Sequence, residues 1–253
     1  MFRKTVQRIL DIFAIPLAYL LRNRRVQEEL WKINHFRPES GLCHWCHRPN
    51  DIEEEVYNIA TRQSAQYVVD HFSHISGTID RYHMLRYCVQ RASIDGLFLE
   101  FGVYNGDSIN CIAETVQKTV HGFDSFDGLP EDWEACKSGQ FSRNGVAPKV
   151  HDSVQLHVGW FEDTLPKFVQ NHKEPAAFIH IDSDLYSSAK TVLTLLQKQI
   201  VSGTVIVFDE YFNYPNWQQH EFRAFQEFVR DCDIHYEYIA YCSRGYSVGV
   251  LIK

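Results

Sequence analysis

The sequence lacks an excess of basic residues. Its 253 residues include 25 Lys and Arg against 32 Asp and Glu, which gives a formal net charge of −7. A protein that binds nucleic acid presents a basic face to the phosphates, so we expect no nucleic-acid partner. The sequence also shows no internal repeat and no low-complexity tract, so we expect ordinary globular domains.

A disulfide framework is also lacking. The seven cysteines are an odd number and are irregularly spaced. Several of them, such as Cys88 and Cys111, fall within apolar patterns, where cysteine acts as a small hydrophobic residue. This usage is typical of a reducing compartment, and we expect a cytoplasmic protein.

No apolar run is long enough to predict a membrane span. The stretch from Ile9 to Leu21 is apolar apart from Asp11, whereas a spanning helix needs about 20 apolar residues. Arginines follow it without a small-residue cleavage site, so a signal peptide is not predicted. Two interpretations of residues 1–25 stay open: a helix packed on the protein or on the partner in a homodimer, or peripheral contact with a membrane surface.

Residues 1–75 are predicted to form a helical appendage, and residues 76–253 a larger α/β domain. The appendage contains a loop in which Cys43, Cys46 and His47 follow the order C-x-x-C-H. This order occurs at haem attachment sites, and clustered Cys and His also bind zinc. A loop without any metal is the third interpretation, and all three stay open.

From residue 97 onward, short apolar runs alternate with helical patterns, which predicts a parallel sheet with crossover helices. We expect strands at 97–102, 120–125, 154–159, 176–182 and 203–209, with a terminal hairpin at 235–242 and 246–252. Helices are expected at 51–72, 82–92, 187–200 and 218–230. The segment 127–150 has several Gly and Pro and few apolar residues, so we expect a flexible flap.

The first of these strands leads into a turn with two glycines. Glu100, Gly102 and Gly106 form the pattern E-x-G-x-x-x-G, and Asp107–Ser108 is expected to cap the next helix. A dinucleotide-binding turn has the pattern G-x-G-x-x-G, but Tyr104 stands where the middle glycine would be. We therefore expect the backbone to approach a ligand other than a dinucleotide, and we disfavour a nicotinamide dehydrogenase.

Carboxylates follow several of the predicted strands. Asp124 ends the second strand, where an acidic residue can accept both ribose hydroxyls of a nucleoside. Asp182 and Asp184 follow the fourth strand, and Asp209 and Glu210 follow the fifth. Clustered carboxylates repel one another unless a proton or a cation intervenes, and such hard oxygen ligands suit Mg²⁺ better than zinc. Alternatively, one or two of them cap the helices that follow.

Five motifs occur in the order found in one known family. They are the glycine turn, FDSFDGLP at 123–130, GWF at 159–161 with TLP at 164–166, D-x-D-x-Y at 182–186 and DEY at 209–211. By these motifs, residues 75–253 resemble the macrocin O-methyltransferase (TylF-type) family, class I enzymes that use S-adenosylmethionine and a divalent metal to methylate sugar hydroxyls. The resemblance implies a Rossmann-like α/β fold with a mostly parallel seven-stranded sheet and a terminal antiparallel hairpin.

The resemblance also implies which residues carry the chemistry. Asp182, Asp209 and Glu210 would hold Mg²⁺ or another hard divalent cation, although the family usually has Asp in place of Glu210. Asp184 would be the general base that removes the hydroxyl proton. The alternative, in which Asp184 only caps the helix that starts near Ser187, stays open.

The residues implied in binding S-adenosylmethionine lie on the turns after the strands. Glu100 would lie near the methionine amino group, Asp124 at the ribose, and Ser125 and Phe126 beside the adenosine. Trp160 either stacks near the adenine or packs in the core. The full set is Glu100, Gly102, Tyr104, Gly106, Ser108, Asp124, Ser125, Phe126, Trp160 and Asp182.

The expected activity is therefore methylation of a hydroxyl on a sugar or a glycosylated small molecule. Two alternatives stay open: a metal-dependent phenol or catechol O-methyltransferase, and a non-catalytic scaffold that binds the cofactor. The aromatic residues that follow Glu210 either hold the acceptor or only pack, and His220 is an alternative base.

Overall fold

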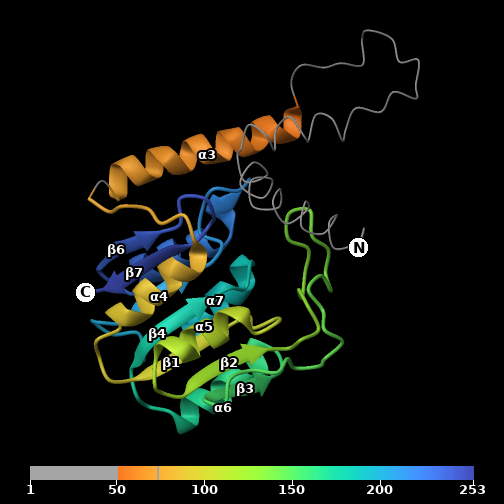
Figure 1. Cartoon of the computed structure of the whole chain (residues 1–253), viewed down its shortest axis with the longest axis vertical. Helices are drawn as coiled ribbons and strands as arrows, with labels where there is room; N and C mark the ends of the chain where they lie inside the picture. Colours follow the sequence, from red (N-terminus) through yellow and green to blue (C-terminus); the bar gives the residue numbers. More distant parts are fainter. Residues whose placement is uncertain (1–50, 73) are drawn as a thin grey trace, which may run out of the picture. The chain divides into compact units, whose positions relative to one another are not determined.

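The computed structural model describes residues 51–72 and 74–253 (Figure 1). The residues from Ile52 onward form one compact unit, which includes helix α3 (Ile52–His71). The predictions made for residues 1–50, including the C-x-x-C-H loop and the membrane contact, lie outside the described residues. Within the described part, no helix is both long and apolar enough to cross a membrane.

A seven-stranded sheet forms the centre of this unit, in the order β3-β2-β1-β4-β5-β7-β6. Only β7 runs antiparallel to its neighbours, β5 and β6, so the predicted terminal hairpin is confirmed. The strands are β1 (Leu97–Phe101), β2 (Val120–Asp124), β3 (Val154–Val158), β4 (Ala176–Ile181), β5 (Val205–Phe208), β6 (Tyr236–Tyr241) and β7 (Val248–Ile252).

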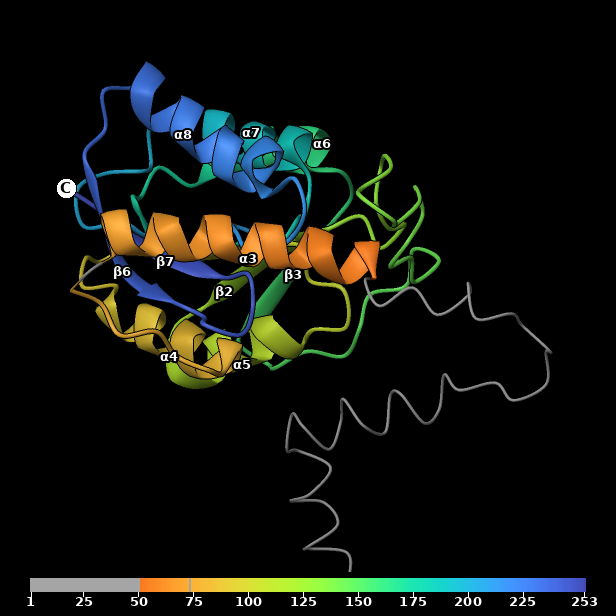
Figure 2. The same cartoon turned by 90° about the horizontal axis from the view of Figure 1, so that it is seen from above.

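Helices cover both faces of the sheet, as Figure 2 shows from above. One face carries α4 (Arg81–Arg91) and α5 (Asp107–Thr115), and the opposite face carries α6 (Phe161–Asn171), α7 (Tyr186–Leu195) and α8 (Glu221–Asp231). Each helix turns an apolar stripe inward, as α8 does with Phe225 and Val229. Strand β1 is buried at every position because it lies between these two layers.

Hydroxyl groups tie helix α3 to the far end of the sheet. The hydroxyl of Tyr238 on β6 lies 2.6 Å from that of Tyr67 on α3 and 2.7 Å from that of Tyr211. Gln226 on α8 donates to the hydroxyls of Tyr211 and Tyr236, each at 3.0 Å. Buried hydroxyls need such partners, so this network fixes α3 and α8 against β6.

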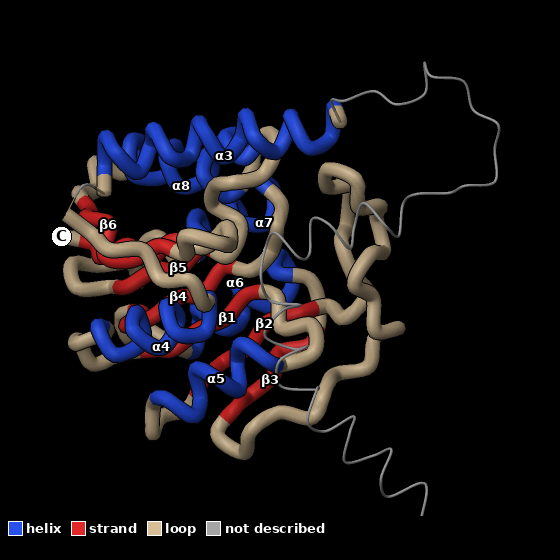
Figure 3. Tube along the Cα trace, turned by 45° about the horizontal axis from the view of Figure 1, so that its top comes forward, coloured by secondary structure: helices blue, strands red, loops and turns tan. Residues whose placement is uncertain are grey.

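The segment 127–150 contains no helix and forms a long loop between β2 and β3 (Figure 3). Backbone hydrogen bonds run across it, from Gly139 to Leu129 and from Leu129 to Gln140, each 2.9 Å long. Its Phe141 ring meets the ring of Tyr104 edge to face, with centroids 5.7 Å apart. The loop therefore reaches over the edge of the sheet where the parallel strands end.

Candidate functional site

A cavity of about 630 Å³ lies at the carboxyl ends of the parallel strands. Ligands bind at this edge in open α/β sheets because the loops that leave the strands diverge there. The cavity is lined by the turns after β1, β2, β4 and β5, by the 127–150 loop and by the start of α4. Most of the residues predicted to bind the cofactor therefore lie around one space.

The glycine turn after β1 is shaped by a close approach of two backbones. Gly102 has φ +92°, and a Cβ at this position would lie 1.7 Å from the carbonyl oxygen of Asp182. Only glycine fits there, because it alone combines this φ with no side chain. The turn after β1 therefore packs directly on the turn after β4, which brings the predicted cofactor loop to the predicted catalytic loop.

The start of α5 differs from the prediction. Gly106, with φ +88°, is the N-cap residue, and it provides no side-chain cap. Asp107 is already the first helical residue, and the Ser108 hydroxyl donates to Glu100 Oε1 at 3.1 Å. The prediction that Asp107–Ser108 caps the helix was wrong because Ser108 bonds to a buried carboxylate on β1 instead.

The side chain of Asp124 accepts hydrogen bonds from three nearby backbone amides. Its Oδ2 accepts from the amides of Val103 and Tyr104, both at 2.8 Å, and its Oδ1 accepts from the amide of Phe126 at 2.7 Å. A carboxylate has about four lone-pair positions, so this group, which still lines the cavity, can accept another hydrogen bond. Its contact with a ribose stays a prediction.

The remaining cofactor residues divide into two groups. Those that line the cavity are Gly102, Tyr104, Ser108, Asp124, Ser125, Trp160 and Asp182. The other three predicted residues lie behind it: Glu100 is completely buried, Phe126 packs in the core beside α4 and α5, and Gly106 lies near Val150. Trp160 is thus on the cavity wall, and Phe126 is a core residue.

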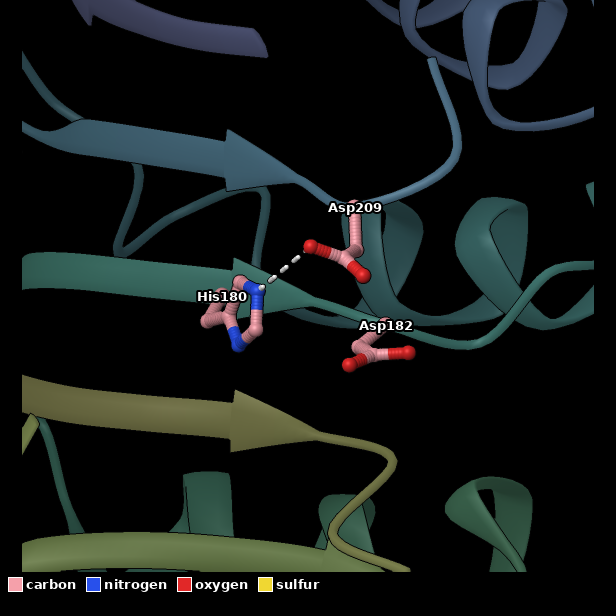
Figure 4. Close-up of side chains that lie close together, drawn as sticks. All are labelled: His180, Asp182 and Asp209. Atoms are coloured by element: carbon pink, nitrogen blue, oxygen red, sulfur yellow. Dashed lines mark ion pairs between the residues drawn. The ribbon is translucent and has the colours of Figure 1, made fainter. Parts of the chain in front are cut away.

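The acidic cluster lies where β4 and β5 end side by side. Ligand atoms of His180, Asp182 and Asp209 lie within 4.8 Å of one another (Figure 4). The predicted third ligand, Glu210, falls outside this group, although it lines the same cavity. Its Oε2 is buried without a hydrogen-bond partner, so this carboxylate has free capacity to bind a cation or a donor.

Arg81, at the start of α4, spans the two aspartates. Its Nη1 lies 2.7 Å from Asp209 Oδ2, and its Nη2 lies 3.5 Å from Asp182 Oδ2. Ser247 donates to the other Asp209 oxygen at 2.8 Å. The guanidinium, whose side chain is 41% exposed, thus occupies the position that a shared cation would take.

His180 is buried between two carboxylates. Its Nδ1 lies 2.9 Å from Glu100 Oε2, and its Nε2 lies 3.8 Å from Asp209 Oδ1. Burial lowers the pKa of His180, but interactions with Asp209 and Glu100 outweigh it and raise the pKa to about 10. Both ring nitrogens thus face carboxylates, and these neighbours favour the charged form of the ring.

Asp184 lies on the cavity wall in a strained conformation. Its φ of 61° is unusual for a residue with a side chain. Burial raises its pKa to about 7, and the charge of Asp209 adds to this effect. Helix α7 begins after Leu185 and has no side-chain cap. The alternative in which Asp184 caps that helix was therefore wrong.

The cluster holds more carboxylates than positive groups. Burial raises the pKa of Asp182 and of Glu210 well above the usual range, and repulsion by Asp209 raises both further. Only Arg81 and His180 provide cations among the described residues that contact the two aspartates. This excess of hard oxygen ligands, with one oxygen of Glu210 unpartnered, fits a divalent cation, provided that the Arg81 side chain moves aside.

The aromatic residues after Glu210 are packing residues. Tyr211, Phe212, Tyr214 and Trp217 are each no more than 3% exposed and do not line the cavity. His220 also lies away from the cavity lining, and its Nε2 is 3.0 Å from Glu134 Oε1. Neither the stacking of an acceptor on these rings nor the use of His220 as the base is supported by this arrangement.

Sequence reasoning missed several residues of this site. Arg81 stands one residue before an expected helix and Glu221 lies on another, neither with a motif that would mark it, and Ser247 lies in the terminal hairpin. His180 carried a weak signal, because it stands two residues before Asp182 and shares its strand face.

Known proteins resemble this chain in sequence. Residues 99–211 match the family model described as a methyltransferase domain. The chain is 27% identical to demethyldecarbamoylnovobiocin O-methyltransferase of Streptomyces niveus over 67% of its own length and 72% of that protein. It is 28% identical to 8-demethyl-8-(2,3-dimethoxy-alpha-L-rhamnosyl)-tetracenomycin-C 4'-O-methyltransferase of Streptomyces olivaceus, over 55% of this chain and 63% of that protein.

A solved structure shows the same fold. The crystal structure of the calicheamicin methyltransferase CalS11 superposes with a TM-score of 0.56 at 19% identity and covers 80% of this chain and 93% of that one. The Rossmann-like methyltransferase fold with its terminal antiparallel hairpin is therefore confirmed.

The contact between the two turns gives a testable prediction. Gly102→Ala should lower the free energy of unfolding by more than about 4 kcal/mol, because the new Cβ would collide with the Asp182 carbonyl. Gly139→Ala is the matched control, since Gly139 also has a positive φ of 83° but a Cβ there would have no other atom within 4 Å. It should cost only about 1–2 kcal/mol. Urea unfolding measures both, and equal losses would contradict the close approach.

Proposed function

We propose that this chain, an S-adenosylmethionine-dependent O-methyltransferase, methylates a hydroxyl of a sugar or glycosylated small molecule with the help of Mg²⁺ or a similar cation. The observation that carries the proposal is that Asp182 and Asp184 line the same cavity as the glycine turn, with Asp209 close beside Asp182. The tetracenomycin relative supports the sugar acceptor, because its name places the methyl group on a rhamnosyl oxygen.

The chain's own residues can perform most of the reaction. The glycine turn lets the cofactor approach the backbone, and Asp124 holds that turn in place. Asp184 lines the cavity, and in this proposal its carboxylate takes the proton from an acceptor hydroxyl, which has a high pKa and is a poor nucleophile when protonated. Alignment of the hydroxyl oxygen with the methyl carbon and sulfur then favours in-line transfer.

A cation would complete the site at Asp182 and Asp209, with Glu210 as the candidate third ligand. When bound, it would acidify the hydroxyl that loses its proton and would balance the excess of carboxylates. Arg81 balances part of that charge when it lies on the two aspartates.

The first test is release of S-adenosylhomocysteine with rhamnosides, other glycosides and catechol as acceptors. We expect turnover with a sugar acceptor, its loss in excess EDTA and its recovery when Mg²⁺ is added back, because the cation is needed to acidify the hydroxyl. Turnover that EDTA does not change would contradict the proposed dependence on a divalent cation. A preference for catechol over every sugar would refute the acceptor class.

Replacement of the base gives a second prediction. Asp184→Asn should lower kcat about 10³-fold, since loss of a general base typically costs about 10²- to 10⁴-fold. The affinity for S-adenosylhomocysteine, measured by calorimetry, should stay unchanged. Asp152→Asn, at an exposed turn before β3, is the control and should behave as the unchanged chain. Retained turnover in Asp184→Asn would remove this residue from the mechanism.

Arg81 gives a third prediction. Arg81→Met should bind Mn²⁺ about 3- to 10-fold more tightly, because the cation no longer competes with a partly exposed guanidinium for the two aspartates. Electron paramagnetic resonance of free Mn²⁺ measures this affinity without turnover. Arg86→Met, at an exposed position of the same helix, should leave the affinity unchanged. Weaker binding in Arg81→Met would show that Arg81 supports the cation instead of competing with it.

A further inference from the structure

Glu221 is a completely buried carboxylate that the proposed chemistry does not use. It is the first residue of α8, and it does not line the cavity. Its Oε1 accepts from the amide of Ser183 at 3.1 Å and lies 3.4 Å from the Ser183 hydroxyl, while its Oε2 accepts from the amide of Glu210 at 3.2 Å. One side chain therefore bonds to two loops that leave different strands.

These two loops carry all the acidic residues of the proposed catalytic and metal site. Ser183 stands between Asp182 and Asp184, and Glu210 directly follows Asp209. The amide of Asp209 donates to the carbonyl of Ile181 at 2.9 Å. In the described structure, no direct backbone hydrogen bond joins residues 182–185 to residues 209–212 beyond that point. Two side chains join the loops there: the Arg81 guanidinium spans the carboxylates of Asp182 and Asp209, and the Glu221 carboxylate bonds to the backbone amides of Ser183 and Glu210.

The two hydrogen bonds hold the loops together against electrostatic repulsion, to which the charge of Glu221 itself adds. Like charges on neighbouring loops push them apart in a buried environment, and Asp184 is additionally held at φ 61°. Backbone amides that are fixed by an acceptor cannot swing to relieve either effect. Helix α8 packs on α7 on the same face of the sheet. Glu221 therefore anchors both loops to a packed helix.

We propose that Glu221 is a positioning residue that holds the loops after β4 and β5 in register, so that Asp184 and the Asp182–Asp209 pair face one acceptor. The inference rests on the proposed function for its effect on turnover. Its structural part, the tie between the loops, can be measured without any acceptor.

Two variants separate positioning from simple packing. Glu221→Gln keeps the size of the side chain, but only one of its terminal atoms accepts, so one of the two amides loses its partner. Glu221→Ala loses both bonds. Asp231→Asn, at the exposed last residue of the same helix, is the matched control.

Hydrogen–deuterium exchange measures directly whether Glu221 protects the two backbone amides. We expect the amides of Ser183 and Glu210 to be protected in the unchanged chain and in Asp231→Asn. In Glu221→Ala both should exchange at least about tenfold faster, and in Glu221→Gln at least one of them should do so. Unchanged protection of both amides in Glu221→Ala would overturn the inference, whatever the activity.

Steady-state kinetics measure how the loss of these bonds affects turnover. In Glu221→Gln we expect kcat to fall about 10- to 100-fold, because misplacement by about 1 Å can cost this much. The Kd for S-adenosylhomocysteine should stay within about twofold, and Tm should fall by no more than about 4 °C, which corresponds to one lost hydrogen bond. A kcat equal to that of the unchanged chain would overturn the positioning role.

The two proposals can fail separately. If the unchanged chain transferred no methyl group to any sugar or catechol, the proposed function would fail, while the exchange experiment would still decide whether Glu221 ties the loops. If turnover were present and insensitive to Glu221→Gln, only the positioning role would fail.

Discussion

The site depends on one electrostatic constraint: several carboxylates are buried at the ends of two neighbouring strands with too few positive groups to balance them. The parallel ladder forces this proximity, because β4 and β5 end at the same edge and each leads directly into acidic residues. Burial then removes the water that would otherwise screen the repulsion. The surrounding structure is arranged to contain it, through Arg81 and His180 as cations and through backbone amides that fix the loops.

The same constraint explains why acidic residues here do different work. Glu100 lies completely buried against His180 and Ser108, so it holds the imidazole ring of His180 in place. Asp124 accepts three backbone amides and therefore shapes the turns after β1 and β2. The carboxylates after β4 and β5 that line the cavity are those of Asp182, Asp184 and Glu210. The neighbours of each carboxylate thus decide whether it supports the fold or faces the cavity.

The sequence predicted the architecture well because its signals were local. Alternating apolar runs located all seven strands, and the glycine pattern located the turn whose close backbone contact only Gly102 permits. The helix cap was missed because Ser108 bonds to Glu100, a partner eight residues away that no capping pattern describes. Phe126 was placed at the ligand although it lies in the core, since a motif marks a position in the chain but not the direction of its side chain.

Residues that meet across a long separation in the sequence could not be predicted, because the signals in the sequence are local. Arg81 meets Asp209 across 128 positions of sequence, and Glu221 meets Ser183 across 38. Such pairs are created by the packing of α4 and α8 on opposite faces of the sheet, and neither residue stands in a recognisable pattern. The residues that balance or support a charge are therefore visible only once the layers are assembled.

The edge-to-face pair of Tyr104 and Phe141 has a consequence for how molecules enter and leave the cavity. Both rings are largely exposed, at 44% and 39%, and they join the 127–150 loop to the glycine turn. An aromatic pair of this kind contributes only about 0.5–1.5 kcal/mol, which thermal motion overcomes readily. Because both rings line the cavity, their separation would widen the space between the 127–150 loop and the glycine turn, which the hydrogen bond from Arg143 to Asn105 also joins.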